Sequence, residues 1–244
     1  MKVGTSYKRL YIHVSGKMDG NMSFRYGTPE NVRDNRFAFL LKSRAKGLPI
    51  VFINASAPAQ CIHLVKKSNI NAGLMNFDSA IVCDGLVTNR IKTVLALLIA
   101  DCMPIVLYSP IDNVLAMIHS GFPGVRNEVV SKAISVMTKM YGVESKNIFA
   151  YIGPSIKMDS YIYSDIGDFR AGKWQDHVFK QKNMTYKVDL QGALISELLS
   201  NGLRADKITS SPIDTFKSLE YFSHYRSVVK SEHEERFMCI AWME

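Results

Sequence analysis

Short apolar runs bounded by turn residues recur along the chain and predict a fold built around β-strands. Runs of this length that are rich in β-branched and aromatic residues are typical of buried strands. We expect strands at residues 10–14, 50–54, 93–100, 114–118, 147–152 and 237–242.

Three longer stretches carry the signals of helices. Thr28 followed by Pro29 matches an N-cap with proline at the first helical position. Apolar residues spaced three and four apart over 125–140 form one face of a helix, and Gly142 is placed to end it. Asp189 is placed to cap a further short helix. Because strands and helices interleave irregularly, we expect an α+β or irregular α/β fold with mixed sheets flanked by helices, and not a doubly wound sheet.

The composition is that of an ordinary globular protein. The chain has 244 residues, of which 47% are hydrophobic and 21% charged, and no segment has the composition of a linker. We therefore expect one domain over residues 1–244. The formal net charge of +8 permits an anionic partner. The basic residues are scattered, however, which favours a solvated surface and a positive site for a small phosphate-bearing substrate over nucleic-acid binding.

Neither secretion nor membrane insertion is indicated. The N-terminus lacks the apolar core of a signal peptide, and no stretch approaches the ~20 apolar residues of a membrane span. The four cysteines show no spacing typical of a disulfide framework. We expect a cytoplasmic protein with reduced thiols and no membrane partner.

Candidate chemistry gathers where three expected extended segments end. His63 closes one segment, Cys102 directly follows the strand at 93–100, and His119 closes the strand at 114–118. Side chains at the same end of a sheet can meet, and two imidazoles with one thiolate leave a fourth position open on zinc. Such an ion activates water or a substrate oxygen. The first hypothesis is therefore a catalytic Zn²⁺ site.

A second hypothesis uses two of the same residues without a metal. Cys102 and His119 form a thiolate–imidazole nucleophile pair, with Asp101 or a backbone carbonyl orienting the histidine. Gly121 and Gly124 follow in a turn whose amides can approach a ligand closely. This turn has no following Lys-Ser or Lys-Thr and is not a P-loop, and no dinucleotide fingerprint occurs.

Short motifs occur in order along nearly the whole chain, among them Asn-Met-Ser-Phe-Arg, Ala-Asp-Cys-Met-Pro and His-Ser-Gly-Phe-Pro-Gly. The segments that carry them are 21–25, 35–36, 61–63, 84–88, 100–104, 119–124, 153–156, 189–190 and 222–224. This series resembles the laccase-domain family, which is also called multicopper polyphenol oxidase-like and purine nucleoside phosphorylase/adenosine deaminase.

The resemblance implies that His63, Cys102 and His119 are zinc ligands, the set already reached from their chemistry. It also implies a fold shared in outline with deamidase toxins that use a Cys–His pair. The implied reactions are phosphorolysis of adenosine, inosine and methylthioadenosine, and deamination of adenosine. The oxidase name fits poorly, because a multicopper centre needs many histidines and a His₂Cys site, whereas this chain has six scattered histidines.

The sequence departs from the family where phosphate is expected to bind. Phe122 and Pro123 stand where the family has Trp and Arg, and proline offers no N–H. We therefore consider Arg25, Arg36 and Arg226 as replacement cations for substrate, with surface or capping arginines as the structural alternative.

Taken together, the sequence predicts a zinc-dependent enzyme of purine nucleosides and phosphate, with Asp101 and Cys102 as catalytic residues. Two alternatives stay open. One is the metal-free hydrolase or deamidase that uses Cys102 and His119. The other is a degenerate zinc-binding protein without turnover. The preferred nucleoside and the oligomeric state stay undetermined.

Overall fold

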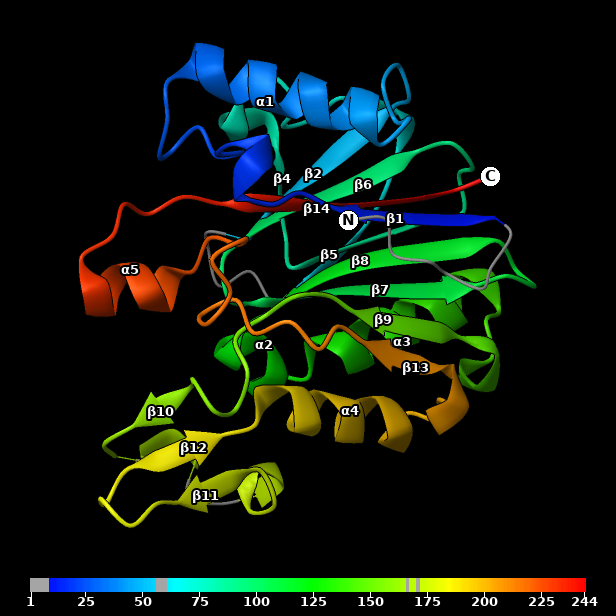
Figure 1. Ribbon diagram of the computed structural model, residues 1–244. Helices are drawn as coiled ribbons and strands as arrows, with labels where there is room; N and C mark the ends of the chain where they lie inside the picture. Colours follow the sequence, from blue (N-terminus) through cyan, green and yellow to red (C-terminus); the bar gives the residue numbers. More distant parts are fainter. Residues whose placement is uncertain (1–8, 56–60, 166, 170–171) are drawn as a thin grey trace.

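The computed structural model describes residues 9–55, 61–165, 167–169 and 172–244 (Figure 1). The chain's first eight residues, on which the expectation of no signal peptide partly rests, lie outside the described residues.

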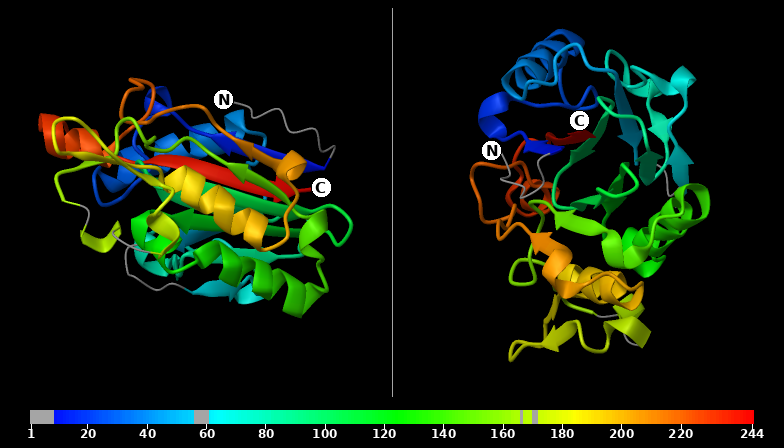
Figure 2. Two further views of the ribbon diagram at one scale, coloured as in Figure 1. Left: turned by 90° about the horizontal axis from the view of Figure 1, so that it is seen from below. Right: turned by 90° about the vertical axis from the view of Figure 1, so that its right-hand side faces the viewer.

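Two large mixed sheets face each other at the centre of the molecule, and a small sheet projects from one side (Figures 1 and 2). The first is ordered β1-β14-β6-β2-β4, the second β13-β9-β7-β8-β5-β3, and the small sheet β10-β12-β11. The strands are β1 (Leu10–Val14), β2 (Ile50–Asn54), β3 (Ile62–Leu64), β4 (Ile81–Val82), β5 (Gly85–Thr88), β6 (Val94–Ile99), β7 (Met103–Ser109), β8 (Val114–Ser120), β9 (Phe149–Ile152), β10 (Ile162–Tyr163), β11 (Val178–Lys180), β12 (Tyr186–Val188), β13 (Ile208–Ser210) and β14 (Phe237–Met243).

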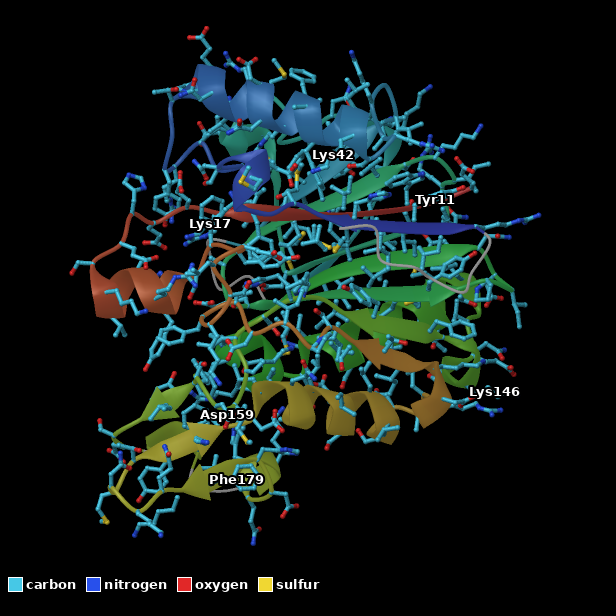
Figure 3. The ribbon with its side chains drawn as sticks, in the orientation of Figure 1. Tyr11, Lys17, Lys42, Lys146, Asp159 and Phe179 are labelled. Atoms are coloured by element: carbon cyan, nitrogen blue, oxygen red, sulfur yellow. The ribbon has the colours of Figure 1, made fainter. Side chains whose placement is uncertain are left out.

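Helices cover the outer faces of the two large sheets. α1 lies on the first sheet, whereas α3 and α4 lie on the second, with α2 beside them (Figures 1 and 2). Figure 3 marks Lys42 on α1 and, far from it, Phe179 on the small sheet. The helices are α1 (Pro29–Lys42), α2 (Phe122–Arg126), α3 (Val129–Tyr141), α4 (Leu190–Ser200) and α5 (His224–Lys230).

The central strands read as continuous apolar runs because they are buried on both faces. On β8, Val114, Ala116 and Ile118 pack toward the helices, while Leu115 and Met117 pack between the two sheets. Side chains alternate along a strand, so His119 continues the row that lies between the sheets. This alternation places the candidate chemistry in the central layer.

The predicted fold class is confirmed: the protein has mixed sheets flanked by helices, and the strand and helix positions agree closely with the apolar pattern. Thr28 caps α1, Asp189 caps α4 and Gly142 ends α3 in a left-handed conformation, as expected. The sequence analysis missed β7, whose apolar run contains Pro104, and it missed α5. None of the helices in the described part of the chain is long and apolar enough to cross a membrane.

Candidate active site

A pocket of about 210 Å³ opens between the two large sheets, at the end where β14 begins and β8 finishes. Its walls come from six separate parts of the chain. The lining residues are Ser23, Arg25, Tyr26, Ile53, Ala55, Leu98, Ile99, Ala100, Cys102, His119, His224 and Arg236.

Cys102 and His119 meet in this pocket because β7 and β8 pair in antiparallel register. Met103 lies opposite Ser120, so Cys102 at the start of β7 faces the end of β8. Cys102 lies close enough to the His119 ring to raise the pKa of that imidazole. Gly121 leaves room for the thiol, since a Cβ at that position would lie 2.7 Å from Cys102 Sγ. The two residues that both hypotheses share are therefore in direct contact.

Asp84 is the carboxylate that orients His119. It precedes β5, its carbonyl accepts from His119 N at 2.8 Å, and its Oδ1 lies 3.3 Å from His119 Nδ1. Burial acts to lower the pKa of His119, but the neighbouring Cys102 and Asp84 outweigh it and raise that pKa to about 10. The structure thus brings a thiol, an imidazole and a carboxylate together. The carboxylate is Asp84, whereas the sequence predicted that Asp101 or a backbone carbonyl orients the histidine.

His63 lies on β3, on the same face of the sheet as Asp84 and His119 by strand register. Its Nε2 lies 3.3 Å from Asn69 Oδ1. No three His, Cys, Asp or Glu side chains among the described residues come close enough together to hold a metal ion. The donor chemistry of the predicted set fits zinc, but its three members are not gathered in this structure.

Asp101 positions the chain and is not among the residues that line the pocket. Its backbone is left-handed, with φ at +81°, which is uncommon for a residue other than glycine. Its carboxylate accepts hydrogen bonds from Thr215 Oγ1, Ser223 Oγ and Tyr225 N, at 2.6, 2.9 and 2.6 Å. These bonds fix the turn that leads into Cys102. Asp101 therefore orients this turn and the start of α5, and His119 is oriented by Asp84 instead.

Two of the three arginines considered for substrate binding are instead buried and hydrogen-bond the backbone within the fold. Arg36 is fully buried and donates to the carbonyls of Met22, Gly73 and Leu74. Arg226 is 1% exposed and donates to four backbone carbonyls and to Glu232. Neither lines the pocket. Both arginines therefore have a structural role, but they lie in the interior and not at the surface as the alternative expected.

Arg25 does line the pocket. Four further polar residues that were not predicted for this site line it as well: Ser23, Tyr26, His224 and Arg236. No sequence pattern predicts Arg236 as a site residue, because it follows two glutamates in a segment with the composition of a charged surface turn. Only the packing of the end of this turn against the loop that follows β1 places its side chain on the pocket wall.

Comparison with known proteins identifies the family. The profile described as multi-copper polyphenol oxidoreductase laccase matches residues 14–244. The chain belongs to this family. The family match therefore confirms the resemblance derived from the motifs, and it extends over all the elements that build the pocket.

Curated relatives carry a different name. A purine nucleoside phosphorylase of Clostridium acetobutylicum is 27% identical over 63% of this chain and 66% of its own length. One of Rickettsia prowazekii is 31% identical over 65% of this chain and 63% of its own length. The chain thus spans slightly less than two thirds of these relatives.

Solved structures share the fold. The hypothetical protein YfiH of Bacillus licheniformis superposes with a TM-score of 0.87 over 96% of this chain and 93% of its own, at 22% identity. YlmD of Geobacillus stearothermophilus gives a TM-score of 0.84 over 96% of this chain and 91% of its own, also at 22% identity. These similarities support the architecture described above.

Proposed function

We propose that this protein is a purine nucleoside enzyme whose reacting centre is the Cys102–His119 pair. The observation that carries the proposal is the contact of these two residues in a pocket of a chain that belongs to the family described above. Relatives named purine nucleoside phosphorylase support the substrate class. The reaction proposed is phosphorolysis of adenosine, inosine or methylthioadenosine, with deamination of adenosine as a further reaction.

The pocket suits an uncharged nucleoside next to polar groups. Ile53, Leu98 and Ile99 supply apolar wall at one side, and Cys102 and His119 lie at another. In phosphorolysis a phosphate oxygen attacks C1′ of the ribose, the bond from C1′ to the purine breaks, and its electron pair leaves with the base, which takes up a proton. The Asp84 carboxylate holds the His119 ring, which lines the pocket, through its contact with Nδ1.

Zinc held by His63, Cys102 and His119 is the proposed cofactor. It would supply Lewis-acid activation of water or of a substrate oxygen. The donor set is chemically right for zinc, and His63 would bind the ion through Nδ1 if its Nε2 keeps the contact with Asn69 Oδ1. The imidazoles bind a metal only when neutral, so the raised pKa of His119 would act against zinc binding.

Metal content tests the cofactor. The protein is purified without added metal, and its zinc is measured by elemental analysis beside Cys102→Ala and His63→Ala. Near-stoichiometric zinc in the wild type and little in both variants supports the site. Absence of zinc from all three proteins would refute the proposed zinc site, and abundant copper would instead support the oxidase function that the family name implies.

Turnover tests the reaction class. Inosine and adenosine are incubated with the protein with and without phosphate, and the products are separated by chromatography. Free base with ribose phosphate supports phosphorolysis, and inosine from adenosine supports deamination. Zinc without turnover of either nucleoside would favour the degenerate binding protein.

A metal-free thiol enzyme is the second candidate, and a specific observation favours it. Asp84 contacts the His119 ring, and Cys102 lies beside that ring and raises its pKa, which is the order of groups in a thiol hydrolase. Such an enzyme does not need His63. Substitution of His63 with Ala is expected to abolish the zinc-dependent reaction and to leave a thiol-dependent one intact, so the activity of this single variant separates the two candidates.

A further inference from the structure

One wall of the pocket is positively charged. Arg25 and Arg236 both line it, together with His224, and none of its described lining residues is Asp or Glu. A nucleoside is uncharged, so the nucleoside itself does not explain two arginines on one wall. An anion bound beside it does, because guanidinium groups bind phosphate oxygens with charge-assisted hydrogen bonds.

The two arginines come from distant segments that are bound to each other. Arg236 N donates to Asn21 Oδ1 at 3.1 Å, and Met22 N donates to the Arg236 carbonyl at 3.0 Å. Asn21 is 7% exposed and its Oδ1 also accepts from Ser23 N at 3.0 Å. The loop that carries Arg25 is therefore fixed to the start of β14, and the spacing of the two arginines is built into the fold.

The Arg236 guanidinium is held in place before any ligand arrives. Its plane lies over the Tyr26 ring at 4.6 Å from the centroid, and its Nη2 donates to Tyr26 Oη at 3.1 Å. Glu234 Oε1 accepts from Nη2 and also contacts His224 Nδ1 at 2.7 Å. One carboxylate thus positions two residues of the pocket wall. These contacts use Nη1 and Nη2 only, and the Nε–H has no hydrogen-bond partner in the described part of the chain.

Arg25, in contrast to Arg236, is not paired with a carboxylate of the described residues. Its backbone N–H donates to Ser23 Oγ at 3.3 Å, and its side chain makes no hydrogen bond or ion pair with any of the residues that the structure describes. A positioned arginine and an unpaired one that line the same pocket give both geometry and net charge for a dianion.

We infer that Arg236 and Arg25 form the binding subsite for the phosphate co-substrate, with Glu234 as the positioning residue for Arg236. The inference rests on the proposed function for the identity of the anion. In this subsite, Arg236 takes the place predicted for Arg36 and Arg226, whose side chains hydrogen-bond backbone carbonyls in the interior. The subsite also provides cations for phosphate in a chain whose turn after β8 has Pro123 and no cation at that position.

Direct binding of inorganic phosphate tests the subsite without depending on turnover. Phosphate is titrated into the full chain by calorimetry at low ionic strength, since salt screens such contacts. Arg236→Gln and Arg25→Gln are each expected to raise the dissociation constant at least about tenfold, because a hydrogen bond to a charged group is lost. In turnover assays each raises the KM for phosphate and leaves the KM for inosine nearly unchanged.

Arg204→Gln is the matched control. Arg204 is also bonded to a carboxylate two residues away, Asp206 at 2.9 Å, but it lines no part of this pocket. It is expected to leave phosphate binding unchanged. Arg25→Gln keeps the test decisive if loss of Arg236 impairs folding, because no described side chain depends on Arg25.

The outcomes separate this inference from the proposed function. Phosphate that binds equally to the wild type and both pocket variants, or fails to bind the wild type, overturns the subsite even if nucleosides are converted in a phosphate-independent reaction. Phosphate binding that is lost in both pocket variants supports the subsite even if no nucleoside is converted.

Discussion

Gly121 offers the most direct test of the reacting centre, because its missing side chain makes room for Cys102. In Gly121→Ala the new Cβ would lie 2.7 Å from Cys102 Sγ, whereas ordinary contact begins at 3.4 Å. The thiol must therefore shift by at least about 0.7 Å, from 2.7 to 3.4 Å. The backbone at Gly121 is extended, with φ at −97°, so alanine is acceptable there and the clash is the main effect.

Misplacement of a reacting group by about 1 Å costs ~10²-fold in rate. We expect kcat/KM for inosine to fall by about that factor in Gly121→Ala, which corresponds to about 2.7 kcal/mol of transition-state stabilisation. The rate of Cys102 alkylation and the zinc content are expected to fall as well. Overpacking of this kind destabilises the fold by about 1–3 kcal/mol, so the activity is expressed per folded molecule, as measured by urea unfolding.

Gly124→Ala is the matched control, since it makes a similar clash in the same segment. Its Cβ would lie 2.8 Å from Ser120 Oγ and 3.3 Å from Val129 Cγ1, away from Cys102. A similar loss of stability is expected, with kcat/KM nearly unchanged. Equal kcat/KM in Gly121→Ala and the wild type, with equal alkylation rates, would refute the placement of Cys102 at the reacting centre.

Three further predictions concern residues with structural roles. Burial raises the pKa of Glu197, so the folded protein binds the proton of this carboxyl more tightly than the unfolded chain does. The free energy of unfolding of the wild type relative to Glu197→Gln is therefore expected to decline as pH rises above ~4.5. Urea unfolding of both proteins at several pH values measures this difference, and parallel pH profiles would contradict the prediction. Arg226→Gln is expected to lower the free energy of unfolding by at least about 3 kcal/mol, because backbone carbonyls lose a charged donor. The KM for phosphate is expected to stay unchanged in the molecules that fold. A raised KM for phosphate with normal stability would instead support the predicted role of Arg226 in substrate binding. Asp101→Asn places an amide where three donors already point and is expected to cost about 1–3 kcal/mol in thermal or urea unfolding, and unaltered stability would show that these contacts are dispensable.

The apolar pattern predicted most of the secondary structure because the responsible interactions are local. Thr28 and Asp189 accept hydrogen bonds from backbone amides three residues away, and such caps can be read from the adjacent sequence. The run that forms β7 was missed, since a proline within an apolar run argues against a strand. Pro104 lies in this strand opposite His119, where its Cγ closely approaches Gly153.

The site shows how far residue types alone can lead. The chemistry of Cys102 and His119 was sufficient to select them, and their contact agrees with that choice. The predicted roles of Arg36 and Arg226 are not supported, because both guanidinium groups satisfy backbone carbonyls within the fold. The sequence around an arginine does not show whether its side chain faces a pocket or the interior. Only the burial of the side chain in the folded structure distinguishes the two cases.

The sequence by itself determined the alternation of strands and helices, the helix ends, and the thiol and imidazole available for chemistry, because each depends on residues near one another in the chain. The tertiary structure alone decided that Asp84 orients His119, that Asp101 binds Tyr225 across 124 positions of sequence, and that Arg236 reaches the pocket wall. Such contacts depend on the register and stacking of whole sheets. The burial of many side chains fixes that register together, and no local pattern encodes it.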